Sequence, residues 1–168
     1  FGSSGMDGAT TEEKAWTCLR QAAIAILNTA CPADKARRTQ VAAELWRSGS
    51  LPILDTLSQD LELVPAAPAQ DANLNVVSKG KVKAGSLRHR IYGVCNAERY
   101  AIDLMWDSVA RFADSDGDGG SAPPEDFFDE WVRIAEDEAR HFTGWAAHLE
   151  TQYNTCYGDL PIHEMLWE

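Results

Sequence analysis

The chain has 168 residues, of which 45% are hydrophobic, and a formal net charge of -11. This length and composition fit one domain with a substantial core and exclude a disordered chain. The negative charge argues against nucleic acid as a general partner, because phosphate binding requires a basic face. No apolar run approaches the roughly 18 residues that a membrane-spanning helix requires, and no secretory signal is visible, so no membrane partner is expected.

The cysteines and the first residues bear on where the protein works. The four cysteines are scattered and form no paired zinc or redox motif: Cys18, Cys31, Cys95 and Cys156. This usage predicts a reducing, intracellular and cytoplasmic location. Residues 1–5 are interpreted as a remnant of an expression sequence, with Met6 as the native start.

Residues 6–63 carry helical patterns. Apolar residues at helical spacing predict a helix over residues 11–30 and a second one from Pro32 to near Gly49, with a further helical turn within 51–57.

Residues 64–85 contain prolines, small residues and three lysines within five positions. They are expected to form an extended linker, with a weak signal for a hairpin over residues 73–82.

Two long helices are predicted in the segment 86–168. The first runs from an N-cap at Ser86 to about Phe112, and the second from about Pro124 to Gln152. An acidic, glycine-rich loop separates them, and residues 157–168 look like a turn followed by the start of a third bundle helix. The predicted fold class is therefore all-α, with an antiparallel long-helix hairpin joined to N-terminal helices.

In each long helix, one glutamate occupies a position where the apolar pattern would place a hydrophobic residue: Glu98 in the first helix and Glu138 in the second. The first stripe comprises Leu87, Ile91, Val94, Ile102, Met105, Val109 and Phe112, and the second comprises Trp131, Ala135, Phe142, Trp145 and Leu149. A bare carboxylate in a core costs several kcal/mol unless an arginine, a proton or a metal ion compensates it. Arg99, Arg133 and Arg140 lie off the stripes.

His141 lies one turn beyond Glu138 and flanks the same face. Glutamate and histidine are both common ligands of transition-metal ions. Both glutamates lie about 14 residues from the inter-helix loop, or roughly 20 Å along their helices, so a hairpin brings them level. The sequence therefore predicts Glu98, Glu138 and His141 as ligands of a metal ion. The alternative is a pair of carboxyl groups satisfied internally by a proton or a tyrosine.

The inter-helix loop offers a second chemistry. Asp114, Asp116, Asp118 and Glu125 have the spacing of an EF-hand calcium loop between two helices. Ser121 occupies the usual apolar position, and two prolines crowd the end of the loop. An acidic insertion is therefore the preferred interpretation over calcium binding.

The remaining histidines and the polar residues near the glutamates have simpler interpretations. His148 and His163 could support the metal ligands from outside, although His148 is more simply a surface residue. Trp106, Trp131 and Trp145 are expected in the core, whereas Asp103, Asp107 and Asp137 are expected on solvated faces.

Three segments carry a family resemblance: residues 97–107 (AERYAIDLMWD), 127–142 (FFDEWVRIAEDEARHF) and 157–168 (YGDLPIHEMLWE). The sequence resembles a family of uncharacterised ferritin-like proteins, and the similarity covers most of the chain. The resemblance implies a ferritin-like di-metal carboxylate bundle, in which the ligands of the first half fall on Glu98, Glu138 and His141.

Two departures from the family matter. Asn96 stands where family members often have a histidine, and the family continues past Glu168 with two further helices that supply a second Glu and a second Glu-x-x-His. Either the chain is truncated, or a second copy supplies the missing half as a homodimer.

The resemblance leaves three function classes open. They are a di-iron or di-manganese enzyme that uses oxygen or peroxide on an unknown substrate, a metal-storage or ferroxidase protein, and a non-catalytic helical scaffold with an incomplete site.

Overall fold

The computed structural model describes residues 10–11, 13–55, 63–77, 85–113 and 123–162. After a 3-10 turn at Glu13–Ala15, the helices are α1 (Leu19–Leu27), α2 (Pro32–Arg47), α3 (Leu87–Phe112) and α4 (Glu125–Tyr153). Across these ranges, extended pairing is limited to one isolated parallel bridge between Val76 and Ile162. The predicted all-α class is confirmed. None of the described helices is long and apolar enough to span a membrane.

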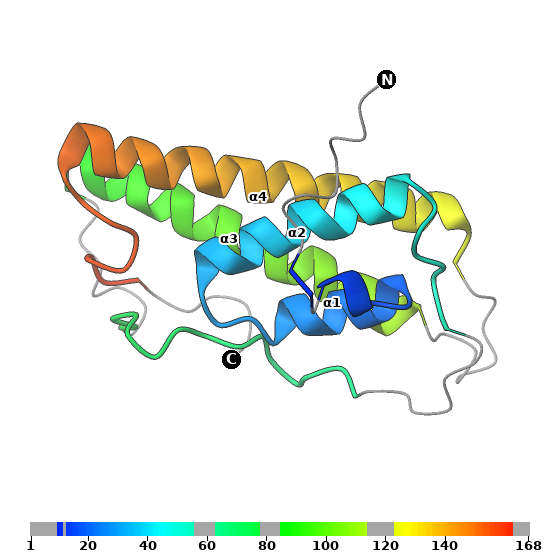
Figure 1. Ribbon diagram of the computed structural model, residues 1–168. Coiled ribbons are helices and arrows are strands. Elements are labelled where there is room, and N and C mark those ends of the chain that lie inside the picture. Colours follow the sequence, from blue (N-terminus) through cyan, green and yellow to red (C-terminus); the bar gives the residue numbers. More distant parts are fainter. Residues whose placement is uncertain (1–9, 12, 56–62, 78–84, 114–122, 163–168) are drawn as a thin grey trace, which may run out of the picture.

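The helices form two layers. The long helices α3 and α4 lie side by side as an antiparallel hairpin, which is the most extensive helix pair in the structure (Figure 1). In the second layer, α1 packs on α3 and α2 packs on α4. One side of the hairpin is thus covered by the N-terminal helices.

Local sequence fixes the ends of the long helices. The Ser86 hydroxyl accepts a hydrogen bond from the His89 backbone N–H, which begins α3 as predicted. Pro124 precedes α4, and the acidic residues Glu125 and Asp126 in its first turn suit the positive end of the helix dipole. At the other end of α4, Asn154 takes a left-handed conformation (φ 47°) that stops the helix.

The N-terminal expectations need correction. The helix expected over residues 11–30 is split, because the Cys18 thiol caps α1 by accepting from the Gln21 N–H while the Gln21 side chain accepts from the Thr17 N–H. Residues 51–55 are not helical. The hairpin over 73–82 is wrong for residues 73–77, since Val77 instead donates to the Ile162 carbonyl. The rest of both segments lies outside the described residues.

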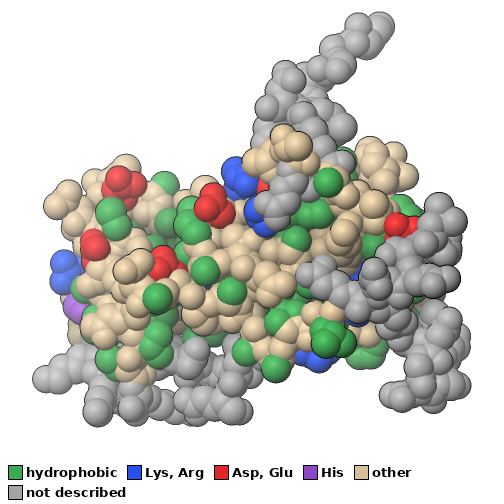
Figure 2. Space-filling view, turned by 60° about the horizontal axis from the view of Figure 1, so that its bottom comes forward, with side chains coloured by type: hydrophobic (Ala, Val, Ile, Leu, Met, Phe, Trp, Pro, Cys, Tyr) green, Lys and Arg blue, Asp and Glu red, His purple; other side chains and the backbone are tan. Residues whose placement is uncertain are grey.

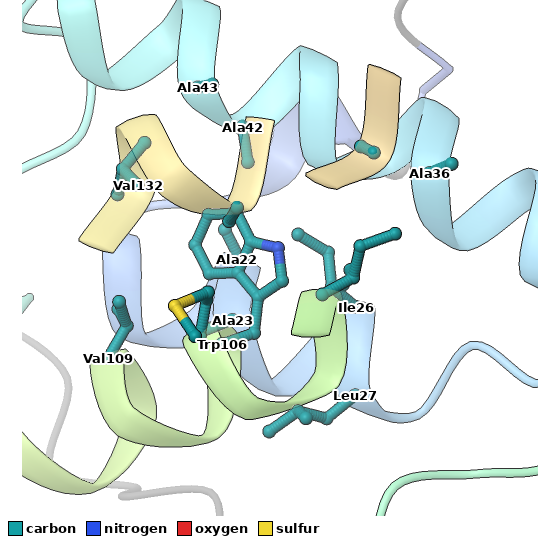
Figure 3. Close-up of a cluster of buried hydrophobic side chains, with 14 of the residues drawn as sticks. Ala22, Ala23, Ile26, Leu27, Ala36, Ala42, Ala43, Trp106, Val109 and Val132 are labelled. Carbon is teal, nitrogen blue, oxygen red and sulfur yellow. The ribbon is translucent and has the colours of Figure 1, made fainter. Parts of the chain in front are cut away.

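The core lies where the two layers meet. Figure 3 shows the Trp106 indole at its centre, among apolar side chains of all four helices. Trp106 is fully buried, and its indole N–H donates to the Thr39 hydroxyl at 2.9 Å. The large ring therefore fills the gap between α2 and α3 without leaving its polar atom unpaired.

The buried face of α3 differs from the predicted stripe. Ile102, Met105 and Val109 are buried as expected, but Leu87, Val94 and Phe112 are 62%, 41% and 49% exposed. The buried face of α3 instead includes polar residues: Tyr92, Cys95, Asn96, Arg99, Asp103 and Asp107. Asp103 and Asp107 were expected in solvent, and the structure shows this to be wrong: Asp103 is buried against Lys35 of α2, and Asp107 is buried while it pairs with Arg111 of the same helix.

Figure 2 shows one face of the molecule, on which a few acidic and basic side chains lie among apolar ones.

Candidate metal centre

The hairpin brings the three predicted ligands together. Glu98 lies in the middle of α3, and Glu138 and His141 lie one turn apart in α4. One ligand atom from each residue lies within 4.8 Å of the others. The His141 Nδ1 is 3.4 Å from a carboxylate oxygen of Glu138. Level placement of the two glutamates, expected from their equal distances to the loop, is thus observed.

The sequence pattern predicted that the cluster would lie in the core, but the structure places it at a partly exposed position. Glu98 is partly buried, and the side chains of Glu138 and His141 are 21% and 49% exposed. Because α1 and α2 cover the other side of the hairpin, the cluster lies at the seam between α3 and α4, near the side that none of the described helices covers. We call this side the outer face; it comprises Val94, Ala97, Ala101, Leu104 and Trp145.

Glu98 is the most perturbed group of the cluster. Partial burial raises its pKa to about 7, and the neighbouring Glu138 carboxyl adds to the rise. His141 and the Trp145 indole N–H act in the opposite direction. Burial, with a smaller contribution from Glu98, raises the pKa of the Cys95 thiol to about 12, so this cysteine stays protonated. A cation placed between the carboxylates would relieve the unfavourable environment of Glu98.

Trp145 is a member of the site that the sequence pattern missed. It was expected in the core but is 36% exposed, and its N–H acts on the Glu98 carboxyl. Its spacing of four residues from His141 and seven from Glu138 places it on the same face of α4, which is the signal that could have identified it.

Two further histidines, His148 and His163, were considered as supports of the metal ligands. His148 is exposed and packs edge-on against the rings of Trp145 and Tyr153, so it reaches the centre only through Trp145. His163 lies outside the described residues.

The alternative calcium loop also lies largely outside the described residues, since these do not include Asp114, Asp116 or Asp118. Glu125 is described and is an exposed residue of the first turn of α4.

The donor set fits a transition-metal ion. Two carboxylates and one imidazole are typical ligands of iron, manganese or zinc, whereas calcium prefers oxygen ligands alone. Three protein ligands leave positions open for water, for a substrate or for donors from another segment.

The family model described as "Protein of unknown function (DUF455)" matches residues 28–168. An uncharacterized protein of Haemophilus influenzae is 32% identical over 83 residues, a segment that covers 46% of this chain and 26% of that relative. No solved structure matches.

Proposed function

We propose that this chain, which belongs to the DUF455 family of proteins of unknown function, binds iron or manganese as half of a ferritin-like carboxylate bundle. The observation that carries the proposal is the convergence of Glu98, Glu138 and His141, from two antiparallel helices, to within 4.8 Å. The same arrangement of one glutamate and one Glu-x-x-His provides half of the ligands of a di-metal bundle.

A metal ion explains the cluster better than a shared proton. A proton between Glu98 and Glu138, with His141 hydrogen-bonded to Glu138, would satisfy the two carboxyl groups but would not require ligand atoms of all three residues to converge. Each of the three groups offers a lone pair to one point, which is the property that a cation requires and a hydrogen-bond network does not.

Each residue of this centre would have a distinct role in binding the ion. Glu98 and Glu138 would hold the ion and balance its charge, and the neutral His141 would add a nitrogen ligand. Trp145 would orient Glu98 through its indole N–H. When bound, iron or manganese would supply one-electron redox chemistry toward oxygen or peroxide. The reaction class that we propose is therefore oxidation or oxygenation of a substrate.

The centre requires a second helical pair for a full ligand set. Three ligands and an uncovered outer face support a partner that packs along α3 and α4 and adds a further Glu and Glu-x-x-His. A second copy of this chain would supply these groups in a homodimer. In a longer polypeptide, later helices would do the same, and the matched segment covers only about a quarter of the Haemophilus influenzae relative.

Metal titration tests the proposal. Manganese(II) added to the metal-free protein should bind saturably in calorimetry, and His141→Ala should weaken binding by about tenfold or more. His148→Ala is the matched control, because it removes an exposed histidine two turns further along α4. Equal manganese binding by the wild type and by His141→Ala would contradict the assignment.

A further inference from the structure

A buried cluster of charged side chains lies between α2, α3 and the segment at residues 69–70. The side chains of Lys35, Asp103 and Arg99 are 2%, 0% and 2% exposed. The Lys35 ammonium pairs with one carboxylate oxygen of Asp103 and also donates to the Ala69 carbonyl at 3.4 Å. Arg99 lies on the other side of the carboxylate, with its Nη1 3.5 Å from Asp103 Oδ2.

Within the described part of the chain, this cluster has an excess of one positive charge. Ionised Lys35, Asp103 and Arg99 sum to one positive charge, and transfer of the Lys35 proton to Asp103 leaves the sum unchanged because arginine keeps its charge. The next carboxylate of α3, Asp107, receives both of its short contacts from the Arg111 Nε. A buried charge without a counterion is strongly unfavourable, so the excess calls for an anion.

The free hydrogen-bond donors of Arg99 show where that anion would bind. The Nη1 donates to the Gln70 side chain at 2.7 Å, and the guanidinium lies 4.0 Å from the centre of the Tyr100 ring. The Nε and Nη2 are buried and have no hydrogen-bond partner among the described residues, and the nearby Tyr157 hydroxyl donates to Asn96. These two atoms form one edge of the guanidinium, and their two parallel N–H groups match the two oxygens of a carboxylate.

We infer that the Nε and Nη2 edge of Arg99 binds a small carboxylate anion of the size of formate or acetate. A water molecule could satisfy the two donors but would leave the excess charge uncompensated. Chloride could balance the charge, but it offers a single acceptor centre, whereas a carboxylate offers one oxygen to each of the two N–H groups. The site is separate from the metal ligands and does not depend on the proposed function.

The wild-type protein provides the direct test. Sodium formate is titrated into protein labelled with nitrogen-15, at constant ionic strength, and the Arg99 Nε–H resonance is followed. A saturable shift of this resonance is expected with formate, and none is expected with chloride. An Arg99 resonance that does not move, or that moves equally with chloride, would overturn the inference.

A variant pair tests the fork itself. Arg99→Lys keeps the charge but removes the paired donors, and formate should bind to it at least tenfold more weakly. Arg140→Lys is the matched control, since Arg140 is exposed and pairs with Asp137 on α4. Wild-type formate affinity in a folded Arg99→Lys would overturn the assignment. If that variant does not fold, the titration of the wild type decides alone.

Discussion

Glu98 is the residue whose charge state most affects the candidate metal centre. Its pKa rises from 4.5 to about 7 on folding, because burial and the Glu138 carboxyl both disfavour the ionised form. The folded protein therefore holds this proton more tightly than the unfolded chain does. The stabilisation from Glu98 is fully present below pH 4.5 and is lost as the pH rises through about 7.

The metal-free protein should consequently gain stability when Glu98 is neutralised. At pH 8 in the presence of a chelator, Glu98→Gln should raise the melting temperature by a few degrees, whereas at pH 5 the variant and the wild type should be nearly equal. Thermal unfolding between pH 5 and pH 8 measures this difference. Glu150→Gln, an exposed change on α4, is the control and should have little effect at either pH. A destabilised Glu98→Gln at pH 8 would mean that the carboxylate has a structural role.

Metal binding should release the same proton. At pH 6 Glu98 is largely protonated in the folded protein, so manganese binding should expel about one proton, and at pH 8 it should expel close to none from this group. Calorimetry in two buffers with different ionisation enthalpies gives the number of protons released. A proton count that is equal at both pH values would contradict the role of Glu98 as a ligand.

The helix elements show which interactions between segments hold the site in place. The hairpin of α3 and α4 is fixed against α2 by the buried contact between Lys35 and Asp103, and by the hydrogen bond from Trp106 to Thr39. Asp103 follows Glu98 by five residues on the same helix. A displacement of α3 relative to α2 would therefore also move the Glu98 carboxylate.

Removing one partner of the buried contact should be costly. Lys35→Met leaves the Asp103 carboxyl buried beside Arg99 alone and should lower the free energy of unfolding by about 3 kcal/mol. Adding Asp103→Asn should cost less in the Lys35→Met background than in the wild type, because the contact between Lys35 and Asp103 is already lost there. Urea unfolding of the two single variants and the double variant measures the coupling. Strictly additive losses would show that the two side chains do not act as a pair.

Features that depend on neighbouring residues were predicted from the sequence, whereas features that depend on contacts between distant segments were not. The ends of α3 and α4 and the level placement of Glu98 and Glu138 were predicted correctly, because capping residues and helical spacing are local properties. The buried positions of Arg99 and Asp103 were missed, because their partners come from α2 and residue 70. The exposure of Trp145 was missed for a related reason: spacing along one helix does not tell which of its faces other helices cover.

At the scale of the whole molecule, the outer face is the open side of a two-layer bundle. Val94, Leu104 and Trp145 are 41%, 39% and 36% exposed there, next to ligands that are themselves partly exposed. A partner on this face would bury apolar surface and ligands together, so assembly and metal binding should be coupled.

The homodimer form of the proposal predicts a change of mass. Manganese should shift the chain from monomer to dimer in light scattering coupled to gel filtration, and Leu104→Glu should prevent the shift by burying a charge at the interface. Gln152→Glu, at an exposed position of α4 outside the outer face, is the control that adds the same single negative charge. A wild-type chain that stays monomeric at saturating manganese would rule out the second copy as the partner.

The position of the metal ion is the most direct test of the central claim. Crystals grown with manganese(II) should show an anomalous scattering peak at coordination distance, about 2.0–2.3 Å, from oxygens of Glu98 and Glu138 and a ring nitrogen of His141. The claim would be contradicted by crystals that lack such a peak at saturating manganese, with the Glu98 and Glu138 carboxyl groups hydrogen-bonded directly to each other.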